Sequence, residues 1–368
     1  MNLFKNIIEE IKLKFVFTKV NSPYSKNKID EQINVYNTSN SGLTYSEAKD
    51  LINLVVDQKL NTLKDEAETI YYKRINEFKN FLIKKISSLS ESEIKKLREP
   101  DMQLTLFEAT KISGRKQSDE LRSLLANLVV NRIKHDKTGE EELKNIVYNE
   151  AILTLNKLTI DQLKIITLCY LTKYTSCNLI ESWETYNNYL NKHIKPFLDF
   201  KNTNAEFQHI EYAGCGNTGI QGLSNWDLIR SYKRNYSFLF FNLIEKNQID
   251  SITLPNYIKN KIIALDTKED KYYIKVRNKV ELENYLKENN MNEEILKNIT
   301  SIYESHIKNE DEIKKKIMDE TDIGKELIQL CEKSIFERLY LTTVGIAIGA
   351  SYFEQVVGEI INIDIWIN

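Results

Sequence analysis

The sequence predicts a mainly α-helical protein: a long N-terminal helix and an antiparallel helical bundle, followed by a smaller α+β, winged-helix-like C-terminal region. Glycine and proline are scarce, at 11 and 4 of 368 residues, whereas turn-rich folds contain more of both. Apolar residues recur at helical spacing over long stretches of the chain. Two capping boxes, Thr44–Glu47 and Thr159–Gln162, place helix starts directly before two of these stretches.

Three domains are expected: an N-terminal arm (1–41), a helical domain (42–200) and an α+β domain (201–368). The arm contains apolar residues at helical spacing, which predict a short amphipathic helix. These residues are Phe4, Ile7, Ile8 and Ile11. Residues 32–38 alternate like a β-strand. A lone strand needs a partner, either elsewhere in the chain or on another subunit.

The strongest local signal is the long helix that begins at Thr44. Its apolar residues keep the helical period from Ala48 to Ile86, and neither Gly nor Pro occurs between Gly42 and Pro100. A helix of about 43 residues is about 65 Å long, which exceeds the usual length in a globular domain. We therefore expect part of this helix to pack on another subunit. The chain is expected to form a homo-oligomer through the long helix and the arm.

Shorter helices complete the predicted helical domain. Their boundaries are marked by Pro100, by Gly114, by Gly139 and by the second capping box. The segments are 100–114, 118–135, 140–156, 159–174 and 179–200. Because the connections between them are short, consecutive helices are expected to be antiparallel neighbours in a bundle.

From about residue 201, strand-like and helical segments alternate. Residues 206–212 are strand-like, and residues 227–243 are helical and strongly aromatic. Segments 261–266 and 272–276 flank a polar turn, which predicts a β-hairpin. The remaining predicted elements are charged helices over 281–333, the segment 338–343, an apolar helix over 344–357 and a strand over 360–368. This closing order resembles the end of a winged-helix module, by analogy alone.

Composition narrows the class of protein. The formal net charge is −2 with 28% charged residues, which argues against a DNA-coating protein. The apolar runs are too short for a membrane span, and the first 20 residues include Glu9 and Glu10 and show no signal cleavage site. The four cysteines show no CxxC spacing, so we expect reduced, structural thiols. A cytoplasmic location is expected.

A glycine-rich motif, Gly214-Cys-Gly216-Asn-Thr-Gly219, matches GxGxxG. A dinucleotide site requires these glycines to open a helix inside a βαβ unit. The next predicted helix begins only near Asp227, so a tight turn is favoured and no cofactor is expected.

His209, Glu211 and Cys215 are the candidate catalytic residues. In a strand, His209 and Glu211 share one face, which would suit a metal-dependent nuclease or hydrolase. Cys215 could act as a nucleophile with His209 as its base, although the sequence identifies no third, orienting group. The four histidines show no HExxH or HxH pattern, so no metal is expected and a packed His209 is favoured.

Two further nuclease patterns are incomplete. Glu269-Asp-Lys271 supplies an E-x-K triplet with Asp250 or Asp266 as a notional partner, but it lies in the predicted hairpin turn, where charges are usually solvated. The RxxxxH pattern of many helical RNases is missing, because Arg132 is only three residues before His135.

A possible nucleic-acid patch combines three basic residues, Arg230, Lys233 and Arg234, with neighbouring aromatic residues. Aromatic rings beside cations can stack on bases. The aromatic residues are Trp226, Tyr232, Tyr236 and Phe238. At these spacings they are more often core residues, so nucleic-acid binding is an open alternative that the sequence does not favour.

Several motifs together resemble a known family. They are Gly42–Glu47, Pro100–Gln103, Leu106–Ala109, Asn149–Ala151, Leu158–Leu163, Glu211–Gly216, Leu341–Gly349 and Asp364–Ile367. In this order they resemble the uncharacterised bacterial proteins grouped under the LPO/Vpar locus-tag name, from Gly42 to the C-terminus. The residues that carry the resemblance most directly are Thr44, Glu47, Gly214, Cys215, Gly216, Thr342, Gly345 and Trp366.

The resemblance implies a functional context but no catalytic residues. The family's members look like scattered accessory genes, a pattern shared with phage-defence and abortive-infection genes. The final Leu-Thr-x-x-Gly element also resembles the end of Abi-alpha proteins, whereas residues 1–41 depart from the family pattern.

Three functions are therefore compared. The first is a non-enzymatic, self-associating protein of anti-phage defence, acting as sensor, scaffold or toxic effector with a phage or host protein partner. The second is a metal-dependent nuclease or hydrolase effector. The third is a nucleic-acid-binding regulator.

Overall fold

The computed structural model describes residues 45–135, 142–219, 226–250, 254–267, 269–333 and 335–367, and the backbone alone of 45–63. The chain divides into two units, Met1–Thr62 and Leu63–Asn368. The arm with its predicted helix and strand, and the capping residue Thr44, lie outside the described residues. Among the described residues helices predominate and the few strands are short, so the mainly α-helical prediction is confirmed.

The first described helix is α2 (Tyr45–Ile86). Within the second unit it packs through Phe78, of which 2% is exposed. The Tyr71 ring covers Gly114, where a Cβ atom would lie 2.1 Å from the ring. Arg74 donates a hydrogen bond from Nη1 to the Gly114 carbonyl at 3.3 Å. These contacts hold α2 against the end of α4 (Pro100–Arg115).

The helical bundle contains four further helices besides α2 and α4. Short connectors, α3 (Glu91–Lys95) and η1 (Lys96–Arg98), lead into it. The bundle helices are α5 (Asp119–His135), α6 (Glu142–Thr154), α7 (Ile160–Cys169) and α17 (Thr343–Val357). The predicted capping box of α7 is confirmed: Thr159 Oγ1 accepts from the Gln162 amide, and the Gln162 side chain accepts from the Thr159 amide.

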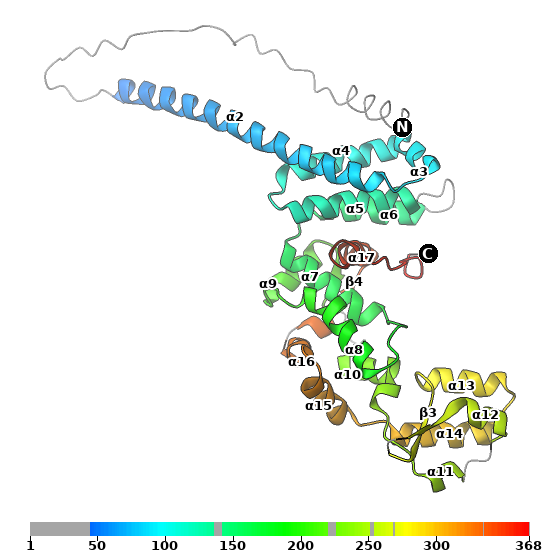
Figure 1. Ribbon diagram of the computed structural model, residues 1–368. Helices are drawn as coiled ribbons and strands as arrows, with labels where there is room; N and C mark the ends of the chain where they lie inside the picture. Colours follow the sequence, from blue (N-terminus) through cyan, green and yellow to red (C-terminus); the bar gives the residue numbers. More distant parts are fainter. Residues whose placement is uncertain are drawn as a thin grey trace. The chain divides into compact units, whose positions relative to one another are not determined.

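Helix α17 is central to this bundle, although it lies near the C-terminus of the sequence. It packs against α5, α6 and α7 (Figure 1). Every residue from Gly345 to Phe353 is buried, as expected for a helix covered on all sides. The core of the helical part is therefore completed by residues almost two hundred positions away from α7.

Two π-helical turns interrupt the helices that follow. Turn η2 (Tyr170–Tyr174) continues α7, and turn η3 (Leu190–Ile194) continues α8 (Trp183–Tyr189). A short 3₁₀ turn, η4 (Lys195–Phe197), comes next. The predicted helix over 179–200 is thus present as α8, η3 and η4 in succession. Such π turns often accompany functional side chains, and η2 contains Lys173.

The strand predicted over 206–212 is wrong, because these residues form helix α9 (Asn204–Tyr212). Phe207 and Ile210 are buried at a spacing of three residues, which is the helical period. The strand interpretation relied on a short window, and short apolar windows do not distinguish the two structures.

A second core is built around the predicted β-hairpin, which is confirmed. Strands β2 (Ile263–Asp266) and β3 (Lys271–Ile274) pair antiparallel, with Ile263 opposite Ile274. Helices α11 (Lys246–Asp250), α12 (Asn256–Ile262), α13 (Lys279–Glu288) and α14 (Glu293–His306) surround this hairpin (Figure 1). Their apolar side chains form one cluster from Ile244 to Tyr303.

The remaining elements flank the second core in the sequence. Those that precede it are α10 (Leu228–Asn235) and η5 (Ser237–Phe240), and those that lie between it and α17 are α15 (Glu310–Glu320), α16 (Gly324–Lys333) and η6 (Ile335–Arg338). A two-residue strand, β4 (Tyr340–Leu341), pairs antiparallel with β1 (Gly216–Asn217).

The strand predicted over 360–368 is wrong for the described part of this tail, because residues 358–367 contain a turn and no strand. The Trp366 amide donates to the Ile363 carbonyl at 3.0 Å. Ile363 and Ile367 are buried, whereas Ile360 and Ile365 are exposed. Without the closing strand, the described residues do not complete a winged helix. No described helix is long and apolar enough to cross a membrane.

Candidate functional site

Five of the family-motif residues converge where α9 ends and α17 begins. We call this the motif junction: Gly214, Cys215, Gly216, Thr342 and Gly345. Gly214 has a φ of 83°, which lies in the left-handed region that glycine adopts without strain. The chain thereby turns out of α9 and enters β1, where Gly216 pairs with Leu341 of β4.

Thr342 joins the two sides of the motif junction. Its amide donates to the Cys215 carbonyl at 3.0 Å, and its Oγ1 donates to the Gly214 carbonyl at 2.7 Å. The same hydroxyl oxygen caps α17 by accepting from the Gly345 amide at 3.2 Å. One side chain therefore fixes both the helix start and the glycine-rich turn.

Gly345 is required by the close approach of two backbones. A Cβ atom at this position would lie 2.0 Å from the Cys215 carbonyl oxygen, far inside van der Waals contact. The first turn of α17 can therefore rest on the turn after α9 only when residue 345 lacks a side chain. Two glycines of the GxGxxG match also have packing roles: Gly214 provides the left-handed turn, and a Cβ atom at Gly216 would lie 2.9 Å from the Tyr340 carbonyl oxygen.

Other motif residues also have structural roles. The Trp366 ring packs edge-on against Tyr170, with centroids 5.5 Å apart. Buried Arg132 donates to Asp101 at 2.5 Å and to Asn149 at 3.3 Å, and these two partners belong to two separate sequence motifs. Glu47 lies in the part of α2 for which only the backbone is described.

Beside the motif junction, Lys173 of η2 forms a feature that the sequence reasoning missed. Its Nζ donates to the carbonyls of Phe336, Glu337 and Leu339 at 2.7, 3.0 and 2.8 Å. The rings of Trp226, Phe336 and Tyr340 surround it at 4.7, 5.1 and 5.2 Å. We call this arrangement the lysine cage. Three carbonyls satisfy all three donors of an ammonium group.

Electrostatics in the lysine cage follow from burial. Desolvation lowers the pKa of Lys173, while the nearby groups Cys169, Cys331 and Glu337 oppose that shift. The neighbouring hydroxyl of Tyr174 accepts from the Leu341 amide at 2.8 Å. The cage therefore holds segment 336–341 against η2. The sequence contains no signal for the lysine cage, because the atoms that accept from Lys173 are backbone carbonyls more than 160 residues away along the chain.

Cys215 does not have the environment of a nucleophile. It is fully buried, and burial raises the pKa of its thiol to about 12. Burial also raises the pKa of Cys169 to about 11. A thiol reacts as its thiolate, so both groups are protonated and unreactive at neutral pH.

His209 and Glu211 lie apart, because two residues of a helix are about 200° apart around its axis. His209 Nδ1 is 3.2 Å from Oε1 of Gln162, the capping residue of α7. Glu211 accepts from the Thr218 hydroxyl at 2.8 Å. Within the described ranges, no group of three or more His, Cys, Asp or Glu residues could hold a metal ion.

The candidate nucleic-acid residues are divided between surface and core. Arg230 pairs with Glu310 at 3.2 Å, Arg234 is exposed and Lys233 is half-buried. Tyr232 and Tyr236 are buried, so their rings cannot stack on bases. Trp226 lies against Lys173 in the lysine cage, and Phe238 contacts Arg277 at 5.8 Å.

Glu269 and Asp270 of the E-x-K triplet lie in the hairpin turn, whereas Lys271 is the first residue of β3 and pairs with Asp266. Lys271 pairs with Glu245 at 2.8 Å, and the Glu269 amide donates to Asp266 Oδ1 at 3.0 Å. Asp250 ends α11. These contacts are those of a β-turn and a surface ion pair.

A further surface feature was not predicted: helices α4 and α6 present large apolar side chains to solvent. We call this set the α4–α6 face, and between 40% and 60% of each side chain is exposed. Its members are Leu104, Phe107, Leu143, Ile146 and Leu153. The two helices pack against each other. Leu104 and Phe107 are three residues apart in the sequence, as are Leu143 and Ile146, but only the structure shows which side of each helix is buried.

Comparisons with known proteins complete these observations. A family model for Vpar-type proteins of uncharacterised activity matches residues 42–367, which is most of the chain. No curated protein matches the chain, and no solved structure matches it.

Proposed function

The chain belongs to this uncharacterised Vpar-type family, and we propose that it is a non-enzymatic, self-associating helical protein of bacterial anti-phage defence or abortive infection. The observation that carries self-association is the α4–α6 face. The defence context rests on the family resemblance, and the further likeness of residues 341–345 to Abi-alpha proteins stays a prediction.

The α4–α6 face has the pattern of a helix–helix seam. Leu143, Ile146, Glu150 and Leu153 follow one another at spacings of three, four and three residues, and all four are exposed. This spacing is that of seam positions in paired helices. Leu104 and Phe107 extend the apolar surface on α4. Several large apolar side chains exposed on two neighbouring helices are the kind of surface that can mark an interaction site.

A second copy of the chain is the partner that we propose for this face. A two-fold dimer brings the same patch of each subunit together, so one apolar surface covers another of equal size. The long helix and the arm, residues 1–41, are proposed to add contacts to the same assembly. The surroundings of two candidate catalytic groups support the non-enzymatic proposal, because burial raises the pKa of the Cys215 thiol and His209 contacts Gln162 at the start of α7.

Sedimentation velocity tests self-association directly. The full chain is expected to sediment as a dimer or larger species, and the variant Leu104→Glu/Ile146→Glu as a monomer, because two buried carboxylates oppose the contact. Leu179→Glu is the matched control, since Leu179 is 80% exposed and lies outside the face. A wild-type chain that stays monomeric at micromolar concentration would refute the proposal.

A phage challenge tests the defence context. Bacteria that express the wild-type chain are expected to resist some phages, and the Leu104→Glu/Ile146→Glu variant is expected to lose this protection while the Leu179→Glu control retains it. Equal protection by the monomeric variant would separate defence from self-association. Absence of protection against a broad phage panel would contradict the defence role.

A further inference from the structure

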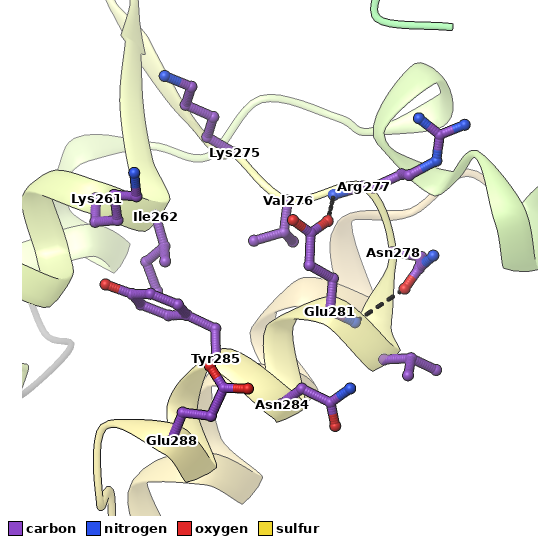
Figure 2. Close-up of a pocket in the computed structure, with 11 residues that line it drawn as sticks. Lys261, Ile262, Lys275, Val276, Arg277, Asn278, Glu281, Asn284, Tyr285 and Glu288 are labelled. Carbon is purple, nitrogen blue, oxygen red and sulfur yellow. Dashed lines mark hydrogen bonds between the residues drawn. The ribbon is translucent and has the colours of Figure 1, made fainter. Parts of the chain in front are cut away.

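The second core contains a pocket that is distinct from the motif junction and the α4–α6 face. Its volume is about 570 Å³, and it lies between the base of the β2–β3 hairpin and α13, which lines it as far as Glu288 (Figure 2). Small-molecule sites have volumes of roughly 300–1,000 Å³. The pocket is therefore large enough for a mononucleotide-sized ligand.

Two lysines line the hairpin side of this pocket. The Lys275 amide donates to the Ile262 carbonyl at 2.5 Å, so the segments that carry Lys261 and Lys275 run side by side. Both lysines are exposed, and neither forms an ion pair with a described residue. The neighbouring Lys271 differs, because Glu245 neutralises it at 2.8 Å. Two uncompensated ammonium groups at one rim favour an anion.

An aromatic and apolar surface faces the same space. Ile262 and Val276 are buried beneath it, and Tyr285 of α13 lines it. The ring of Tyr285 extends from α13 toward the side that carries Lys261 (Figure 2). A planar ring in a ligand can pack against a tyrosine ring of this kind.

Three other charged residues line the pocket, and two of them, Arg277 and Glu281, are engaged in hydrogen bonds. The Arg277 guanidinium donates to the carbonyls of Asn178 and Ile180 at 3.2 and 3.1 Å, and it points away from Tyr285 (Figure 2). Glu281 accepts from the Arg277 amide at 2.6 Å. Glu288 also lines the pocket; it forms no ion pair with a described residue, and its carboxylate lies beside Tyr285, away from Lys275 (Figure 2). Lys261 and Lys275 are therefore the charges available to a ligand at the hairpin side.

We propose that this pocket binds a small phosphate ester that carries a planar ring, such as a nucleoside monophosphate. The phosphate lies between Lys261 and Lys275, because the lysine ammonium is a compact charge suited to phosphate. The ring packs against Tyr285 above Ile262 and Val276. These residues play no part in the proposed self-association, so the two proposals stand or fall separately.

Titration calorimetry on the full chain tests the site with three probes: AMP, adenosine and inorganic phosphate. AMP is expected to bind at least about tenfold more tightly than adenosine or phosphate, since only AMP uses both halves of the pocket. Lys261→Ala/Lys275→Ala is expected to weaken AMP binding by about tenfold or more. Tyr285→Ala is expected to weaken AMP and leave phosphate unchanged.

Lys287→Ala is the matched control. It removes one positive charge from α13, the helix that carries Tyr285, but Lys287 does not line the pocket, so AMP affinity should stay within about twofold. Thermal unfolding of each variant shows that the second core remains folded. Absence of AMP binding to the wild-type chain overturns the proposal. Equal AMP affinity in wild type and double variant, or equal affinity for AMP and phosphate, also overturns it.

Discussion

At the scale of single residues, the motif junction explains why this family pattern contains glycines. Gly345 brings α17 to the Cys215 carbonyl, and Gly214 provides the left-handed turn after α9. Both glycines are required by the geometry of the backbone, so replacing either one is expected to lower the stability of the fold. Two of the three glycines in a pattern that resembles a cofactor loop, Gly214 and Gly216, thus have roles in backbone packing.

Replacing Gly345 by alanine is expected to destabilise the protein by about 3 kcal/mol. The new methyl group would lie 2.0 Å from a backbone oxygen that is fixed by Thr342, so α17 must shift. Chemical denaturation of the variant measures the change. Gly219→Ala is the control, because its nearest neighbours are 3.7 and 4.0 Å away. Equal stability of both variants would contradict the close approach.

Lys173→Met is expected to destabilise the chain by about 2–4 kcal/mol, since three carbonyls lose their shared donor. Methionine keeps most of the side-chain volume, so the loss reports hydrogen bonds and charge rather than a cavity. Lys164→Met serves for comparison, because half-buried Lys164 donates to a single carbonyl, that of Asp199. The free energy of unfolding, measured in urea, should change little for that control.

Thiol labelling tests the protonation of the buried cysteines. Burial raises the pKa of Cys215 to about 12 and that of Cys169 to about 11, from an ordinary value of 9.0. At about pH 8, iodoacetamide should therefore leave both residues unmodified in the folded chain and modify both in urea. Mass spectrometry of the labelled peptides identifies the sites. Rapid labelling of folded Cys215 would restore it as a candidate nucleophile.

The same shifts set a pH dependence for stability. The folded state keeps these thiols protonated to higher pH than the unfolded state does. The contribution of the protonated thiols to the free energy of unfolding is therefore complete below about pH 9. It declines as the pH rises from there toward the raised pKa values of the two thiols.

At the scale of elements, one polar cluster ties three bundle helices together. Asn149 of α6 accepts from Thr105 of α4 at 2.9 Å and from Arg132 of α5 at 3.3 Å. Arg132 also pairs with Asp101 at the start of α4. The cluster places two of the family motifs around one buried guanidinium.

Asn149→Ala is expected to lower the free energy of unfolding by about 2 kcal/mol, because it leaves a buried guanidinium and a hydroxyl with fewer partners. Asn156→Ala, two residues beyond the end of α6 and exposed, should change stability by less than about 0.5 kcal/mol. Thermal and urea unfolding of the two variants make the comparison. A similar decrease in the free energy of unfolding in both variants would show that the polar cluster does not stabilise the packing of the three helices.

Elements with local signals could be predicted from the sequence, and elements with non-local causes could not. The capping box at Thr159 and the β2–β3 hairpin depend on neighbouring residues, and both were correct. Helix α9 was missed because only Phe207 and Ile210 reveal its period in a short segment. The tail after Gly358 alternates like a strand, but its course is set by burial of Ile363 and Ile367 and not by pairing.

At the scale of the whole chain, the contacts that matter most join distant segments. Helix α17 packs on α5, α6 and α7, the lysine cage joins η2 to residues 336–339, and the motif junction joins α9 to α17. None of these pairings has a signature in local spacing. The same holds for the α4–α6 face, since only the packed bundle shows which apolar side chains remain uncovered.

Hydrogen–deuterium exchange at low and high protein concentration tests the proposed self-association through the α4–α6 face most directly. Association through this face should slow amide exchange in peptides covering residues 100–115 and 142–154 at high concentration, because local opening becomes coupled to dissociation. Peptides of the second core should exchange equally at both concentrations. Concentration-independent exchange in α4 and α6, or protection confined to other helices, would contradict it.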